Sequence, residues 1–269
     1  MLVFVRLLSI VCCLGCAKYR HNISIFAPNC VLPKFKDMFS VPNLLTLFNL
    51  FCGCLAVVFA FTGKLHYVPY CVIAAAAADF LDGMVARWLK SNSALGIQLD
   101  SLADMVSFGL VPGIVLFHLL GQAWGSAATL GLTAPAFMLT LFSALRLAKF
   151  NIDTRQTTGF LGLPTPSSTL LVVGLLFWQQ NNFMGAAQWL QNPWLLYGIV
   201  IVVSYLLISE LPMFSLKFKN KGWEGNEQQW LGISLSFILL GLFNGSAISL
   251  SIILYILWSL IRWVMGAAK

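Results

Sequence analysis

The chain has 269 residues, of which 59% are hydrophobic and only 9% are charged, and its formal net charge is +7. An ordinary soluble domain carries about 25% charged residues, so this composition excludes a typical soluble globule. The Lys and Arg residues are scattered in ones and twos across the interhelical loops, with no aromatic interleaving on a single face, which argues against nucleic acid as a partner. The seven cysteines show no Cys/His spacing for zinc and imply no disulfide framework.

Apolar blocks of the chain predict helices that cross a membrane. A bilayer core requires about 20 apolar residues per helix, whereas the strands of a membrane barrel would alternate polar and apolar residues. We therefore predict an all-α, polytopic transmembrane helical bundle of about eight spans, at 42–62, 67–89, 96–120, 126–147, 166–180, 194–215, 229–243 and 246–264.

Three regions are expected along the chain. Residues 1–37 form an N-terminal extension that we expect to be dispensable, because its apolar start only loosely resembles a signal peptide. Residues 38–220 form the helical core. Residues 221–269 form a C-terminal helical hairpin that packs on this core.

The basic residues predict the orientation of the spans, because cytoplasmic loops are enriched in Lys and Arg. A start on the cytoplasmic side leaves only Lys64 outside. The same start places twelve basic residues inside: Lys34, Lys36, Arg87, Lys90, Arg146, Lys149, Arg155, Lys217, Lys219, Lys221, Arg262 and Lys269. We expect an integral protein of the cell (inner) membrane with a cytoplasmic N-terminus.

Four of the nine acidic residues fall within residues 79–104, at the end of the second span and the start of the third. Asp79 and Asp82 are three residues apart and Asp100 and Asp104 are four apart, so each pair shares one helix face. A short connection makes the two spans antiparallel neighbours, and Asp79 and Asp104 then lie at matched depth. Because carboxylates near lipid are unfavourable without a partner or a polar cavity, these four are candidate functional residues.

Four carboxylates at one depth repel each other unless cations hold them together. Hard oxygen ligands of this kind select Mg²⁺ or Mn²⁺ over zinc or copper. The sequence therefore predicts Asp79, Asp82, Asp100 and Asp104 as metal ligands, with two divalent ions expected in the site.

Gly83, Ala86 and Arg87 continue the stripe of Asp79 and Asp82 toward the cytoplasm. Small residues in a membrane helix often serve close helix packing, and a lone interfacial Arg often serves only topology. Beside a metal cluster we prefer a second interpretation, in which the small residues admit a nucleotide and the guanidinium binds a phosphate.

The spacing of these residues resembles the signature of the CDP-alcohol phosphotransferase family, D-x-x-D-G-x-x-A-R, eight residues, then G-x-x-x-D-x-x-x-D. Here it begins at Asp79, resumes at Gly96 and ends at Asp104. Flanking stretches resemble the CDP-diacylglycerol–serine O-phosphatidyltransferase branch of this family. The likeness extends over about residues 40 to 220. The stretches that carry it are Pro42 to Asn49, Leu99 to Gly109, Leu145 to Asn151 and Phe160 to Pro166.

This resemblance implies an enzyme with a six-helix core and a cytoplasmic two-metal site, and it implies a homodimer. The reaction would displace CMP from CDP-diacylglycerol by the hydroxyl of L-serine, giving phosphatidylserine. Asp79, Gly83, Ala86 and Arg87 would bind the nucleotide, and Asp104 would be a ligand or the catalytic base. Arg146, Lys149 and Asn151 are candidates for binding serine or the lipid phosphate.

Other functions remain open at this point. The acceptor alcohol of the same chemistry could be glycerol 3-phosphate or inositol phosphate, although the basic residues are sparse for an acceptor that carries a phosphate. An intramembrane prenyltransferase also uses Asp-rich helices with Mg²⁺, and an acidic cluster can form the cation pathway of a transporter.

Overall fold

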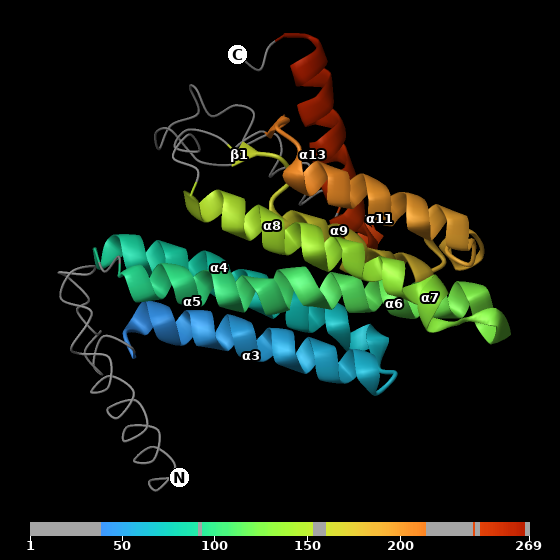
Figure 1. The fold of residues 1–269 in the computed structure, drawn as a ribbon, viewed down its shortest axis with the longest axis horizontal. Coiled ribbons are helices and arrows are strands. Elements are labelled where there is room, and N and C mark those ends of the chain that lie inside the picture. The colour runs from blue at the N-terminus through green and yellow to red at the C-terminus, as the bar shows by residue number, and fades with distance from the viewer. Residues whose placement is uncertain (1–38, 91–92, 153–159, 214–238, 240–242, 267–269) are drawn as a thin grey trace, which may run out of the picture. The chain divides into compact units, whose positions relative to one another are not determined.

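The computed structural model describes residues 39–90, 93–152, 160–213, 239 and 243–266 (Figure 1). Helices dominate these residues, as predicted, with short 3₁₀ turns between several of them. The helices are α3 Val41–Phe61, α4 Val68–Trp88, α5 Ala94–Asp104, the π-helix η2 Met105–Leu110, α6 Val111–Trp124, α7 Leu130–Thr133, α8 Met138–Ile152, α9 Thr165–Gln180, α10 Ala186–Trp189, α11 Pro193–Ile208 and α13 Ala247–Val264.

Local sequence explains where several helices begin. Pro42 and Pro69 stand in the first turns of α3 and α4, where the missing N–H has no helical partner in any case. Ser93 caps α5 through a hydrogen bond from Gly96 N to its Oγ (2.9 Å). Asn192 caps α11 in the same way and Pro193 follows it.

Apolar helices of spanning length confirm a polytopic helical membrane protein. Five described helical stretches are long and apolar enough to cross a bilayer, or six if the bent pair Phe183–Trp189 and Pro193–Ile208 counts as one span. The predicted span at 229–243 lies almost entirely outside the described residues, so the total of eight stays a prediction.

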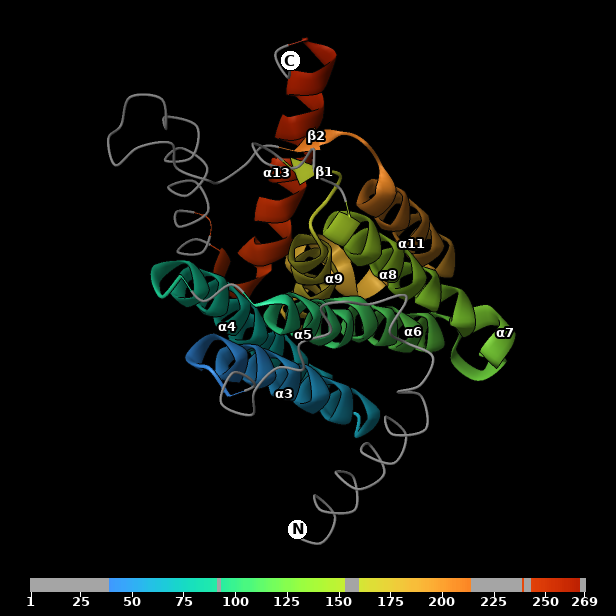
Figure 2. The same cartoon turned by 60° about the vertical axis from the view of Figure 1, so that its left-hand side comes forward.

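Two groups of helices make up the bundle, as Figures 1 and 2 both show. The first group pairs α3 with α4 and places the continuous third span, α5 through α6, beside them. In the second group α11 packs on α8, and α13 packs on α9. The side chains of α9 are mostly buried because α4, α6 and α13 all contact it.

The third span contains a π-helical segment that its sequence pattern did not predict. Pro112 has no N–H, so it cannot donate a helical hydrogen bond to the carbonyl of Phe108. Thr169 of α9 supplies the donor instead, with its Oγ1 2.7 Å from the Phe108 oxygen. Thr140 of α8 likewise donates to the Gly109 carbonyl (3.0 Å). Two neighbouring helices therefore stabilise η2, the segment that directly follows Asp104.

The predicted span at 194–215 is too long, because α11 ends at Ile208. Residues Pro212–Met213 form strand β2, which pairs antiparallel with β1, Phe160–Leu161. Gly162 has φ +74°, and a Cβ at this residue would lie 2.6 Å from the Ser209 carbonyl oxygen. The close approach of two backbones beyond the helix end therefore requires glycine at this position.

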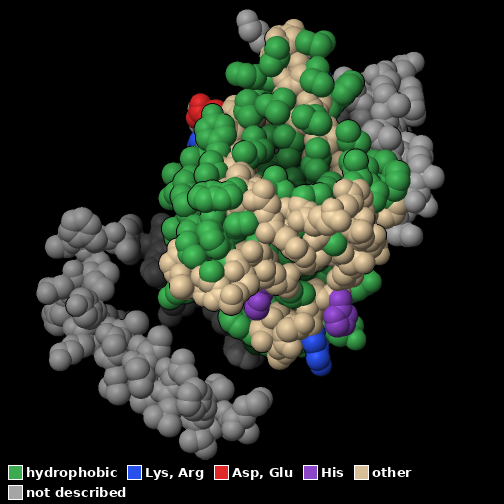
Figure 3. All heavy atoms as spheres, turned by 90° about the vertical axis from the view of Figure 1, so that its right-hand side faces the viewer, with side chains coloured by type: hydrophobic (Ala, Val, Ile, Leu, Met, Phe, Trp, Pro, Cys, Tyr) green, Lys and Arg blue, Asp and Glu red, His purple; other side chains and the backbone are tan. Residues whose placement is uncertain are grey.

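Hydrophobic side chains cover much of the face drawn in Figure 3, and the few charged groups lie at its edges. Helix α3 shows the same property, because it exposes large apolar side chains at Leu44, Phe48, Phe51, Val58 and Phe61. A row of exposed large apolar side chains along one helix is unfavourable in water. Lipid contact explains them, in agreement with the spanning length of the helix.

Candidate active site

Three carboxylates meet where α4 and α5 lie side by side. Asp79, Asp82 and Asp100 each offer an oxygen within 4.8 Å of the others. Asp100 Oδ1 is buried without a hydrogen-bond partner among the described residues. A buried acceptor in this state suits a cation. The oxygen donors of this group fit Mg²⁺ or Mn²⁺.

Asp104 lies next to this group but outside it. The Asp104 side chain is within electrostatic range of the other three carboxylates, although it does not belong to the set gathered within 4.8 Å. Asn49 Nδ2 donates a hydrogen bond to Asp104 Oδ1 (3.1 Å). The spacing in the sequence predicted that carboxylates of α4 and α5 would meet. The structure brings three of them together and leaves Asp104 just outside this set.

Helix α3 contributes polar side chains that the sequence analysis had not assigned to the site. Thr46 Oγ1 lies 2.5 Å from Asp82 Oδ2 and 3.1 Å from the Pro42 carbonyl oxygen. Asn43, Thr46 and Asn49 are all buried, and they recur every three residues along an otherwise apolar helix. This periodic polar face was the signal that could have predicted them, because buried polar groups in lipid require partners.

An open cleft lies beside the carboxylates. Its lining comes from α3, α4 and the start of α5: Pro42, Asn43, Thr46, Asp82, Gly83, Ala86, Ser93, Gly96, Ile97 and Asp100. A Cβ at Gly83 would meet no atom within 4 Å, whereas one at Gly96 would lie 3.2 Å from Asn43 Oδ1. Gly83 therefore borders open space, and Gly96 permits close approach to α3.

The predicted nucleotide-binding residues occupy different parts of this cleft. Asp79 belongs to the carboxylate group, while Gly83 and Ala86 line the cleft itself. Arg87 is exposed at the end of α4, and its Nε donates to the Gly83 carbonyl (2.8 Å). This hydrogen bond folds the Arg87 side chain back along its own helix toward Gly83.

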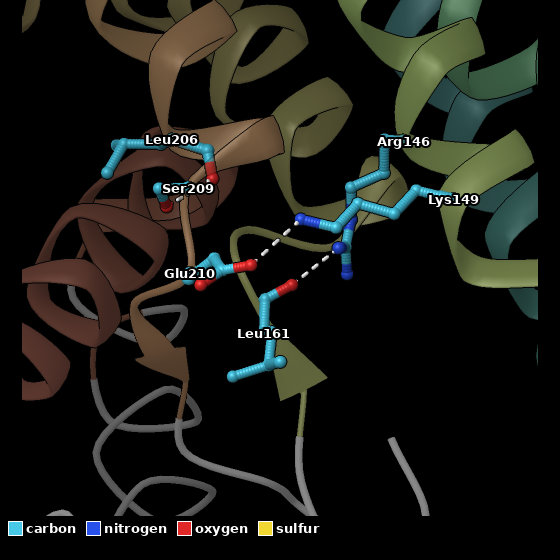
Figure 4. Close-up of polar contacts among 6 residues, drawn as sticks. All are labelled: Arg146, Lys149, Leu161, Leu206, Ser209 and Glu210. Carbon is cyan, nitrogen blue, oxygen red and sulfur yellow. Dashed lines mark hydrogen bonds and ion pairs between the residues drawn. The ribbon is translucent and has the colours of Figure 1, made fainter. Parts of the chain in front are cut away.

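The predicted serine or phosphate residues lie at the end of α8, and Figure 4 shows two of them. Arg146 is buried and donates to the Leu161 carbonyl, and Lys149 forms an ion pair with Glu210 (3.5 Å). Asn151 Nδ2 donates to Ser101 Oγ (2.8 Å), which joins α8 to the residue after Asp100. These contacts connect the end of α8 with β1, with the residues beyond α11 and with α5.

Comparisons with known proteins agree with this geometry. The sequence model of the CDP-alcohol phosphatidyltransferase family matches residues 39–207. The chain belongs to the CDP-alcohol phosphatidyltransferase family. The match contains α3 through most of α11, and therefore contains all four carboxylates and the cleft.

Three relatives with similar sequences carry the same name. A protein of Helicobacter pylori strain J99 is 29% identical over 235 residues, covering 86% of this chain and 94% of the relative. One from Bacillus subtilis is 30% identical over 171 residues, covering 64% and 88%. One from Saccharomyces cerevisiae is 37% identical over 151 residues, covering 50% and 52%. All three are named CDP-diacylglycerol–serine O-phosphatidyltransferase. The prediction of a transferase of this family is confirmed.

Proposed function

We propose that this protein transfers the phosphatidyl group of CDP-diacylglycerol to the hydroxyl of L-serine, giving phosphatidylserine and CMP. The observation that carries the proposal is the group of three carboxylates from two helices at one side of a cleft lined by small residues. The names of the similar family members support serine as the acceptor.

Each part of the cleft has a role in this reaction. We assign Asp79, Asp82 and Asp100 to hold divalent metal, two Mg²⁺ or Mn²⁺ ions, with Asp104 as a further ligand or as the base. Bound metal would neutralise the pyrophosphate and stabilise the leaving CMP. Gly83 and Ala86 admit the nucleotide beside α4, and Arg87 reaches its phosphates from the rim.

Asp104 accepts the proton of the serine hydroxyl in this proposal. The hydroxyl oxygen attacks the phosphorus that carries diacylglycerol, a new P–O bond forms, and the bond to the CMP oxygen breaks. Asp104 suits this task because it lies outside the tight group of three and is oriented by Asn49.

The membrane context of the proposal follows the basic residues. The carboxylate cleft, Arg87 and the end of α8 would face the cytoplasm of the cell (inner) membrane, because cytoplasmic loops are rich in Lys and Arg. Residues 38–220 would form the catalytic core, with 1–37 dispensable and 221–269 packed on the core. The working form would be a homodimer in lipid without nucleic acid as a partner.

The acceptor is tested by CMP release from purified protein with Mn²⁺ or Mg²⁺ and CDP-diacylglycerol. We expect release with serine, and none with glycerol 3-phosphate or inositol phosphate. Release with one of these phosphates alone would change the acceptor but keep the chemistry. Failure with every alcohol would contradict the proposed reaction and favour a prenyltransferase or a cation transporter.

We propose further that Arg146 and Lys149, with Asn151 beside them, bind the serine carboxylate or the lipid phosphate. Lys149→Met should then raise the KM for serine or for CDP-diacylglycerol by at least about tenfold, because a hydrogen bond to a charged group is lost. Lys64→Met, which removes an exposed lysine from the turn after α3, is the matched control and should leave both KM values unchanged. Equal KM values for both variants would assign the Lys149–Glu210 pair to structure alone.

A further inference from the structure

Asn49 of α3 makes two contacts with one short segment of the third span. Its side-chain Nδ2 donates to Asp104 Oδ1 (3.1 Å), and its backbone carbonyl accepts from Ser107 Oγ (3.0 Å). Asp104 and Ser107 both contact Asn49, so they lie on the same side of the third span. Side chain and backbone of Asn49 are therefore both tied to the segment that carries Asp104.

Close helix packing makes the second contact possible. A Cβ at Gly53, one turn beyond Asn49, would lie 2.3 Å from Ser107 Oγ. Any larger residue at position 53 would displace Ser107 and separate α3 from η2. The packing thus fixes the height of Asn49 relative to Asp104.

The Oδ1 atom of Asn49 does not stabilise the fold. Asn49 is 0% exposed, and its Oδ1 is a buried acceptor without a hydrogen-bond partner among the described residues. An unpaired buried polar atom is destabilising, whereas an apolar group of the same shape would not be. The amide therefore destabilises the fold through its unpaired Oδ1, and its one observed hydrogen bond among the described residues is the one from Nδ2 to Asp104.

We propose that Asn49 is a positioning residue for Asp104, an inference that rests on the proposed function. Its amide holds Oδ1 of Asp104, which fixes the rotamer of the carboxylate and leaves Oδ2 for the proton of the acceptor alcohol. Thr46, one turn earlier on the same face, holds one oxygen of Asp82 in the same manner. Helix α3 thereby orients one carboxylate from each of the two helices that carry the motif.

The test replaces Asn49 by a side chain of similar size that cannot donate. For Asn49→Leu we expect kcat to fall about 10- to 100-fold, the usual effect of removing an orienting hydrogen bond behind a functional ligand. The KM values for serine and CDP-diacylglycerol should stay as in the original protein, and so should Mn²⁺ binding followed by electron paramagnetic resonance. The melting temperature in detergent should change little, because losing the unpaired Asn49 Oδ1 offsets losing the donor to Asp104 Oδ1.

A second variant protects the test against misfolding. Asn49→Ala removes the amide without adding bulk or charge beside Asp104, and we expect kcat to fall at least as much. Ser249→Ala is the control, because it removes a buried hydrogen bond from α13 to the Leu171 carbonyl (2.7 Å) without touching the carboxylates. It should lower the melting temperature and leave kcat unchanged.

Two results would overturn the inference. One is an unchanged kcat in a folded Asn49 variant. The other is a kcat loss that comes with a lower melting temperature and weaker Mn²⁺ binding, which would make Asn49 a structural residue. Wild-type protein that releases no CMP with serine would instead contradict the proposed acceptor, and the Asn49 variants would then be compared with the alcohol that is accepted.

Discussion

Asp100→Asn is expected to abolish metal-dependent CMP release. Asp100 offers an oxygen within 4.8 Å of both Asp79 and Asp82, and its buried Oδ1 has no partner among the described residues. An amide at this position loses the negative charge that favours a divalent cation. A bound metal supplies several kcal/mol of transition-state stabilisation, so the loss in rate should be on the order of 10³-fold.

Metal binding should change together with the rate in this variant. We expect titration calorimetry with Mn²⁺ to show markedly weaker binding to Asp100→Asn, with no recovery of activity at physiological Mn²⁺. Asp37→Asn is the control, because it makes the same chemical change in the region predicted to be dispensable. Mn²⁺ binding by Asp100→Asn that equals binding by the unaltered protein would remove Asp100 from the metal site.

The convergence of the carboxylates could be predicted from the sequence because it depends on local geometry alone. Residues three or four apart share a helix face, and a short connection makes neighbouring helices antiparallel. Asp79, Asp82 and Asp100 meet as these two rules require. The family signature then restricted the chemistry, and the match to residues 39–207 confirmed the family.

The contributions of α3 depend on packing that the sequence does not state. Thr46 and Asn49 are ordinary polar residues in a membrane helix until α4 and α5 bring carboxylates against them. The π-helix η2 was missed for a similar reason, because the donors that stabilise it come from Thr140 and Thr169 on other helices. Long-range partners of this kind leave only a weak periodic signal.

The end of α11 shows a third limit of sequence reasoning. Apolar residues resume after Ser209 and Glu210, at Leu211, Met213 and Phe214, and suggested a longer span. The chain leaves the helix at Ser209 because the backbone beyond it pairs with β1 and lies against Gly162. As a result Glu210 lies beyond the helix, where its carboxylate pairs with Lys149.

Asp104→Asn should lower kcat by about 10² to 10⁴-fold, the usual contribution of general acid–base catalysis. Asparagine at this position keeps an oxygen that can accept from Asn49 Nδ2, so the orientation of the side chain is preserved while its ability to take a proton is lost. Mn²⁺ binding should largely remain, because Asp104 lies outside the group of Asp79, Asp82 and Asp100. Single-turnover measurement of CMP release with saturating serine isolates this step, and full activity would exclude Asp104 as the base.

The double variant Asn49→Leu/Asp104→Asn connects the two roles. Residues that act as a unit show strongly non-additive effects. If Asn49 acts only by orienting the Asp104 carboxylate, its removal has nothing further to disturb once that carboxylate is an amide, and the double variant should be no slower than Asp104→Asn alone. Losses that multiply would instead show that Asn49 and Asp104 serve the reaction independently, for example with Asp104 as a metal ligand and a different group as the base.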